Sequence, residues 1–167
     1  MSTDIQRDLE IMARQEQALQ FDAFDRRTAW ELGTRLKTLA EADGVGVLIE
    51  VRMGAETVFL YAMPGTAPDN TNWARRKHNT VDLVHRSSYS VGQELQAKGY
   101  TLTERLGVSD QDYTAAGGCF PIRVRGVGFV GTVTVSGLPQ RDDHRLVVQA
   151  LAQMLNVSLV EQGLQLP

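Results

Sequence analysis

The residue types best suited to chemistry stand together in the segment W-A-R-R-K-H, residues 73–78. Trp73 offers a flat face on which a planar ligand can stack, and Arg76 and Lys77 can hold carboxylates or phosphates. His78 can ligate iron or exchange a proton near neutral pH. The alternative is an ordinary solvated helix face. Helical spacing places Lys77 on the same stripe as Trp73, however, and a lysine that points inward is either paired or functional.

The other two histidines do not extend this set into a metal site. His85 follows His78 by seven residues, which is about 10.5 Å along a helix, whereas zinc ligands lie about 2 Å from the ion. His144 follows two aspartates at the start of the last expected helix, where the helix dipole disfavours an imidazolium. We expect no metal centre, and we expect Asp142 or Asp143 to cap that helix.

Neither Cys119 nor Ser136 stands in a nucleophile motif. Cys119 is the only cysteine, which rules out an intramolecular disulfide and fits a reducing compartment. With no partner base in view, a buried structural thiol is favoured over a nucleophile. Ser136 stands in V-T-V-S-G rather than G-x-S-x-G, so the hydrolase elbow is absent.

The segment GVGFVG, residues 126–131, matches the letters of the dinucleotide fingerprint G-x-G-x-x-G. That fingerprint needs a strand before it and a helix after it. Here the next residues, TVTVSG, alternate as a strand does. The glycines therefore predict a β-hairpin, with positive φ between Arg125 and Gly128 and a close backbone approach at Gly131.

Small residues also stand at the expected strand ends, as Gly117 and Gly118 before one strand and as Ser136 and Gly137 after another. Glycines in such places let another group come close to the backbone. We expect a flat ligand or another subunit to approach there, and we include Gly117, Gly118 and Ser136 in the candidate site.

The elements that must position these residues follow from hydrophobic periodicity. They are, in order, a helix from Ile5, a helix capped by Asp25, strands Val45–Val51 and Thr57–Met63, a helix after Asp69 and Asn70, a second helical piece to Gly99, two strands around Gly126, and a last helix with Leu146 to Leu155. Short connections between successive strands make them antiparallel. The predicted fold is α+β, an antiparallel sheet of about four to five strands covered by helices in a profilin-like α/β/α sandwich.

Length and charge narrow the function classes. The 167 residues fit one domain, 1–167, and a net charge of −3 provides no basic field for nucleic acid. The first residues are charged throughout, and no apolar run of 18 residues occurs. We expect a cytoplasmic protein without membrane or nucleic-acid partners.

Two segments carry a resemblance to a known family. GGCFPIRVRGVGFVGTVTVSGLPQRDDHRLV resembles the signature of the haem-degrading domain family, the GlcG-like and HbpS-like proteins, which runs GG-x-P-I, G-x-x-x-G-x-I-x-V-S-G and then an Asp-led helix. MPGTAPDNTNWARRKHNTVDLVHRSS resembles a subgroup with a P-G-T-x-P-D-N…W-x-x-R-K segment, and Lys77 matches a lysine of the wider family. The matching signature positions are Gly117, Gly118, Pro121, Ile122, Val135, Ser136, Gly137 and Asp142 or Asp143.

The resemblance implies a compact α/β/α fold, symmetric oligomers and, in some members, binding or breakdown of haem; the subgroup is also linked to help in protein delivery. Our main hypothesis is a small oligomeric protein that binds a small anionic ligand, haem or a related tetrapyrrole without covalent attachment, because C-x-x-C-H is absent. Trp73 would stack, Arg76 and Lys77 would hold propionates, and His78 would ligate iron. The alternative is an oligomeric scaffold or adaptor, and a third hypothesis is a cofactor-free enzyme using Cys119 or Lys77.

Overall fold

The structure, a computed structural model, describes residues 3–167 as six helices and four strands. The helices are α1 (Thr3–Ala18), α2 (Arg26–Ala42), α3 (Asp69–Val84), α4 (Ser88–Lys98), α5 (Leu102–Leu106) and α6 (Gln140–Met154). The strands are β1 (Leu48–Met53), β2 (Glu56–Ala62), β3 (Cys119–Val124) and β4 (Gly128–Ser136). Apart from the short α5, every element was expected from the sequence, with bounds shifted by a few residues.

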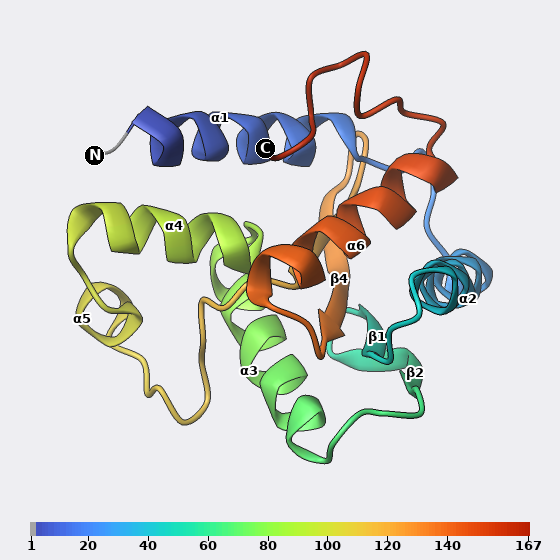
Figure 1. Cartoon of the computed structure of the whole chain (residues 1–167), viewed down its shortest axis with the longest axis horizontal. Coiled ribbons are helices and arrows are strands. Elements are labelled where there is room, and N and C mark those ends of the chain that lie inside the picture. The colour runs from blue at the N-terminus through green and yellow to red at the C-terminus, as the bar shows by residue number, and fades with distance from the viewer. Residues whose placement is uncertain (1–2) are drawn as a thin grey trace.

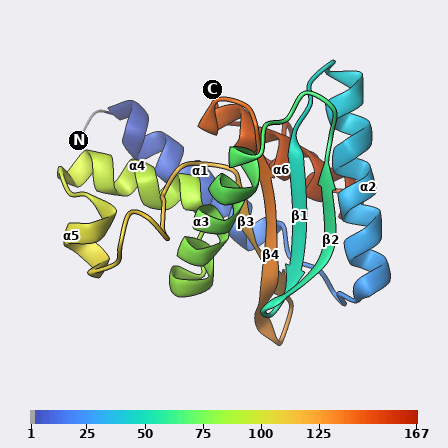
Figure 2. The same cartoon turned by 90° about the horizontal axis from the view of Figure 1, so that it is seen from below.

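The four strands form one antiparallel sheet in the order β2-β1-β4-β3 (Figure 2). Strand β1 is central, and its nearly continuous apolar run suits burial on both faces of the sheet. The long connection through α3, α4 and α5 returns the chain so that β4 pairs with β1 and β3 takes one edge of the sheet. Strand β2 forms the other edge.

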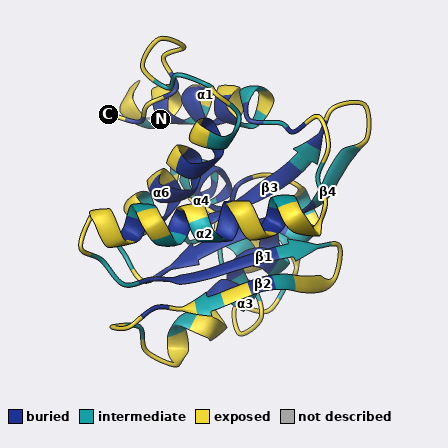
Figure 3. Ribbon diagram, turned by 90° about the vertical axis from the view of Figure 1, so that its right-hand side faces the viewer, coloured by how far each residue is buried: buried dark blue, intermediate teal, exposed yellow. Residues whose placement is uncertain are grey.

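Helices lie on both faces of the sheet, which confirms the α/β/α prediction (Figure 1). Helices α2 and α6 cover one face and bury the main apolar core. Figure 3 shows the buried stripe of α2 turned toward this face of the sheet. Helix α3 covers the other face, mainly over β4 and β3, while α1 and α4 pack together beyond the β3 edge.

Helix starts were only partly predicted. Asp25 forms a capping box with Thr28 at the start of α2, as expected. Helices α3 and α6 instead begin after Pro68 and Pro139, without any side-chain cap. The predicted caps of these two helices were therefore wrong. Proline supplies the fixed φ of a helix start, while Asn70 accepts from the Ala67 amide and Asp143 from Lys77 and the Leu138 amide.

The GVGFVG segment forms the β3–β4 hairpin and not a nucleotide-binding turn. Gly126 and Gly128 have φ of 77° and 106°, as the predicted turn requires. A Cβ added at Gly131 would lie 1.9 Å from the carbonyl oxygen of Arg52 on β1. The hairpin and the close backbone approach are confirmed, and no helix follows to receive a pyrophosphate.

None of the helices among residues 3–167 combines the length and apolar character needed to cross a membrane.

Candidate functional site

A cavity of about 290 Å³ lies between α3, the end of β4 and the start of α6, and we call it the α3–α6 cavity. Three of the predicted site residues line it, Trp73 and Lys77 from α3 and Ser136 from β4. The indole of Trp73 is 38% exposed at this position, whereas Lys77 and Ser136 are buried. The complete lining is Asn70, Trp73, Lys77, Ala116, Ser136, Gly137, Leu138, Gln140 and Asp143.

Lys77 is held by a buried ion pair with Asp143 of α6. Its Nζ donates to Asp143 Oδ2 at 2.9 Å and to the Val135 carbonyl at 3.0 Å. The other oxygen of Asp143 accepts from the Leu138 amide at 2.9 Å. Burial raises the pKa of Asp143 above its usual value, and the Lys77 ammonium offsets part of that rise. The pair ties α3 to α6 across the end of β4.

Gly117 and Gly118 make this arrangement possible through close packing. A Cβ at Gly118, where φ is +130°, would lie 2.8 Å from Lys77 Nζ and 2.3 Å from the Val135 carbonyl oxygen. A Cβ at Gly117 would lie 2.4 Å from the carbonyl oxygen of Gln140, whose side chain accepts from the Gly117 amide. The groups that approach these glycines are therefore the protein's own, and the glycines bring α3, β4 and α6 together around the cavity.

Arg75 and Arg76 hydrogen-bond to the loop that contains residues 110–112. The guanidinium of Arg76 lies 4.6 Å from the centre of the Trp73 ring and donates to the carbonyl of Asp110. Arg75 donates to the carbonyl of Gln111 and to the side chain of Asp112. Neither arginine lines the α3–α6 cavity. Their charges hold the segment before β3 against α3.

His78 lies apart from the cavity and faces the sheet. Its Nδ1 is 2.6 Å from Glu50 Oε1 of β1, and both side chains are almost fully buried. One residue further along a helix turns the side chain by about 100°, so Lys77 and His78 cannot share the position that the sequence hypothesis gave them. Glu50 was missed because it stands in an otherwise apolar strand. The single acidic residue in VGVLIEV was the available signal.

Asp143 was also missed as a site residue, since it was considered only as a helix cap and as a position of the family signature. It stands three and four residues before Leu146 and Val147, which are buried on the inner stripe of α6. An aspartate on an apolar helix stripe indicates a buried partner. That pattern could have directed attention to Asp143, although it does not identify Lys77.

His144 belongs to a different packing region, between α6, α1 and the C-terminal segment. Its ring Nε2 lies 2.9 Å from Gln15 Oε1, and the Gln15 amide nitrogen donates to the Leu164 carbonyl at 2.7 Å. Nε2 therefore carries the proton, and Nδ1 has no partner among residues 3–167. Burial lowers the pKa of His144 to about 3, so the ring is neutral.

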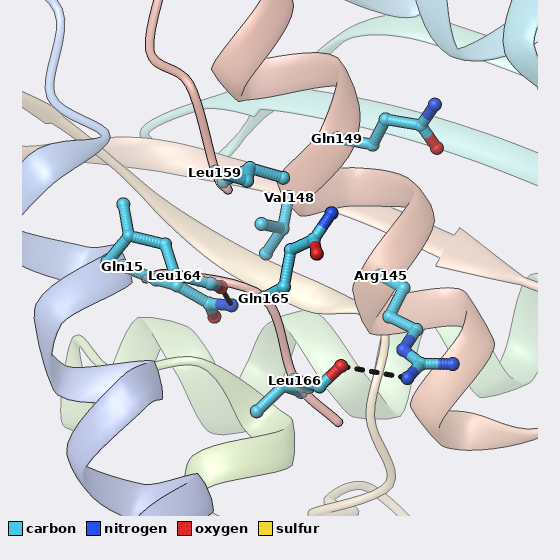
Figure 4. Close-up of a pocket in the computed structure, with 8 residues that line it drawn as sticks. All are labelled: Gln15, Arg145, Val148, Gln149, Leu159, Leu164, Gln165 and Leu166. Atoms are coloured by element: carbon cyan, nitrogen blue, oxygen red, sulfur yellow. Dashed lines mark hydrogen bonds between the residues drawn. The ribbon is translucent and has the colours of Figure 1, made fainter. Parts of the chain in front are cut away.

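A second cavity, of about 400 Å³, lies beside this region (Figure 4). None of the sequence-predicted site residues contributes to it. Figure 4 shows Gln15 bonded to the backbone of Leu164, and Arg145 bonded to the backbone of Leu166, so the C-terminal segment is held in place by backbone contacts. Its lining residues are Gln15, Arg145, Val148, Gln149, Leu159, Leu164, Gln165 and Leu166.

The remaining reactive side chains, Cys119 and His85, lie outside the α3–α6 cavity. Cys119 is fully buried, and burial raises the pKa of its thiol to about 12, which confirms the structural interpretation. His85 ends α3 and stacks on Phe129, with 3.9 Å between the ring centres. Within residues 3–167, no three His, Cys, Asp or Glu side chains converge as metal ligands.

Several proteins of known structure share this fold. The crystal structure of Ybr137w protein is similar with a TM-score of 0.80 at 27% identity, covering 89% of this chain and 87% of that chain. The crystal structure of HbpS has a TM-score of 0.63 at 22% identity and covers 81% of this chain and 92% of that chain. The crystal structure of the PduOC:Heme complex has a TM-score of 0.66 at 17% identity and covers 78% of this chain and 94% of that chain. At these low identities, HbpS and PduOC support the shared α+β fold alone.

The sequence comparison then identifies the family. Residues 24–152 match the family described as haem degrading protein HbpS-like, and the chain belongs to that family. A UPF0303 protein of Azotobacter vinelandii (strain DJ) is 54% identical over 161 residues, 96% of this chain and 97% of that protein. A UPF0303 protein of Serratia proteamaculans (strain 568) is 47% identical over 156 residues, which cover 93% of this chain and 97% of that protein.

Proposed function

We propose that the protein binds a planar ligand without covalent attachment in the α3–α6 cavity. The observation that carries this proposal is that Trp73, Lys77 and Ser136, from two elements far apart in the sequence, line one cavity. Trp73 supplies a partly exposed face for stacking, and the two buried side chains supply polar contacts. Haem or a related tetrapyrrole is the ligand class that the family name and the heme complex of PduOC suggest.

The size and lining of the cavity shape this proposal. Its volume, about 290 Å³, is at the lower end of the roughly 300–1,000 Å³ of typical ligand pockets. Only one edge of a tetrapyrrole enters such a space, and the remainder lies over Trp73. Among the lining residues there is no His, Cys, Met or Tyr, the side chains that hold haem iron. We therefore propose binding with little or no degradation of haem.

A haemin titration followed by the Soret band tests this function, with serum albumin and heat-unfolded protein as controls for nonspecific adsorption. We expect a saturable spectrum and an affinity about fivefold to tenfold lower for Trp73→Ala, because stacking is lost. Trp30→Ala is the matched control, since Trp30 is also exposed but lies on α2, outside the α3–α6 cavity. Equal losses in the two variants, or no saturable binding at all, would refute the proposal.

A second candidate function is that of an oligomeric scaffold, and one surface favours it. Trp30 and Leu60 are 62% and 55% exposed beside the edge strand β2. With Val58, Phe59 and Tyr61 they surround an open depression of about 570 Å³. An apolar surface next to an unpaired strand edge suits contact with a second copy of the chain.

Light scattering at micromolar concentration tests this candidate. We expect an oligomer in the wild type and a smaller species in Leu60→Lys, since a charge would be placed in the contact. Leu83→Lys, at an exposed leucine on α3, is the control. A monodisperse wild-type monomer would exclude the scaffold.

A further inference from the structure

We infer that the α3–α6 cavity recognises the carboxylate of a small aromatic acid, with the carboxylate at the start of α6 and the ring against Trp73. The inference rests on the proposed function, because it assumes that a planar ligand enters this cavity. It adds that the ligand binds through a carboxylate and that a single aromatic ring is sufficient for binding.

The start of α6 is open to an anion. Helix α6 spans 15 residues, follows Pro139 and has no side-chain cap. Gln140 and Arg141 are the first two residues of α6, so their amides have no acceptor within the helix. Leu138 and Gln140 from this turn line the cavity. Uncapped first-turn amides and the positive end of the helix dipole favour a carboxylate.

Ser136 is an independent observation that points to a ligand. The residue is 2% exposed and lines the cavity, and its hydroxyl has no hydrogen-bond partner among residues 3–167. Thr132 on the same face of β4 also lacks a partner among residues 3–167, but its oxygen is sealed inside the protein. A buried hydroxyl without a partner costs stability. The Ser136 hydroxyl opens on the cavity and can donate to a ligand there.

Lys77 and Asp143 decide the sign of the charge that fits. Lysine has three N–H donors, and Lys77 uses two of them on Asp143 and on the Val135 carbonyl. Its third donor remains for a ligand. Both carboxylate oxygens of Asp143 are already engaged, by Lys77 and by the Leu138 amide. The walls therefore offer donors to an anion and no free carboxylate to a cation.

The volume of the cavity and the Trp73 ring favour a single aromatic ring as the remainder of the ligand. Trp73 provides the stacking surface, and Asn70 of the first turn of α3 lies on the same wall. The side-chain oxygen of Asn70, Oδ1, already accepts from the Ala67 amide, so Trp73 provides the main contact of this wall. A volume of about 290 Å³ suits one ring with a single carboxylate. Benzoate is the simplest probe of this class.

The experiment compares benzoate with benzamide, which has the same shape without the charge. It uses the Trp30→Phe background, in which Trp73 is the remaining one of the two tryptophans and reports occupancy by its fluorescence. We expect saturable quenching by benzoate with a Kd about tenfold below that for benzamide, as hydrogen bonds to a charged group permit.

Ser136→Ala tests the hydroxyl, with Thr132→Val on the same strand as the matched control. We expect Ser136→Ala to weaken benzoate about fivefold or more, to leave benzamide unchanged and to melt no lower than the wild type. Thr132→Val should bind both probes as the parent does. Equal loss of both probes, or a loss matched by Thr132→Val, would overturn the assignment.

The outcomes separate this inference from the proposed function. If benzoate and benzamide bind equally, the carboxylate inference fails and the planar-ligand function stands. If neither probe binds but haemin saturates the same sample, the inference again fails alone. If neither probe nor haemin binds, both fail.

Discussion

The two faces of the sheet are built from different chemistry. Toward α2 and α6 the strands present apolar side chains, which belong to one continuous core. Toward α3 they present several polar and charged side chains, most of which are buried, while Arg52 is partly exposed. The first face carries Ile49, Val51, Phe120, Ile122, Val133 and Val135, and the second carries Glu50, Arg52, Thr132, Thr134 and Ser136.

The apolar face mainly stabilises the fold, whereas the polar face mainly orients α3. The apolar face gains free energy by removing surface from water, at about 25 cal/mol for each Å². On the α3 face, Arg52 pairs with the partly exposed Asp82, His78 contacts Glu50, and a buried ion pair joins Lys77 to Asp143. Buried pairs of this kind roughly offset the cost of their own desolvation, so they orient α3 more than they stabilise it. The α3–α6 cavity lies on the face where these polar contacts orient α3.

The largest effect is expected from removing one charge of the pair at the cavity. Lys77→Met leaves Asp143 buried without its cation, and we expect a loss of about 3–5 kcal/mol in the free energy of unfolding. Urea denaturation measures it. Adding Asp143→Asn removes the stranded charge but keeps an acceptor for the Leu138 amide, and it should recover most of the loss. A double variant less stable than Lys77→Met would show that the pair is a net source of stability.

On the apolar face, Ile49→Ala provides the comparison. Ile49 is fully buried on the central strand between β2 and β4, and we expect a loss of about 2–5 kcal/mol from lost transfer energy and a residual cavity. No second substitution in the apolar core should rescue it as Asp143→Asn rescues Lys77→Met. Denaturation midpoints at constant m-value give the test, and a loss below about 1 kcal/mol would mean that this core is loosely packed.

What could be predicted from the sequence follows the same division. Alternation in TVTVS and the stripe of α6 predicted the apolar face, because hydrophobic periodicity depends only on neighbours in the sequence. The α3 face could not be predicted in that way. Lys77 and Asp143 are 66 positions apart, and Arg76 is satisfied by a backbone carbonyl in a loop without any periodic pattern. The residue types of the site were recognisable, but their partners depend on tertiary packing.

His144 tests a third kind of burial, that of an uncharged polar ring beyond both faces. Its pKa is about 3 in the folded protein and about 6.5 when unfolded. Its contribution to stability is complete above pH 6.5 and is lost as the pH falls toward 3, because only the unfolded chain takes up the proton. We expect a loss of about 2 kcal/mol at pH 5 relative to pH 7.

Urea denaturation at these two pH values measures the contribution of His144. In His144→Gln, which cannot take up this proton, the difference between pH 7 and pH 5 should shrink by that amount. An unchanged difference would place the titration elsewhere, for example in the carboxylates.

The smallest effect is expected from Thr132→Val on the α3 face. Thr132 is fully buried, and its hydroxyl has no partner among residues 3–167. Valine keeps the branched shape that suits a strand and removes the cost of burying an unpaired hydroxyl. We expect unchanged stability or a gain of up to about 1 kcal/mol. A loss above about 1 kcal/mol would mean that this hydroxyl is bonded in solution, and that the α3 face contributes more stability than its ion pairs suggest.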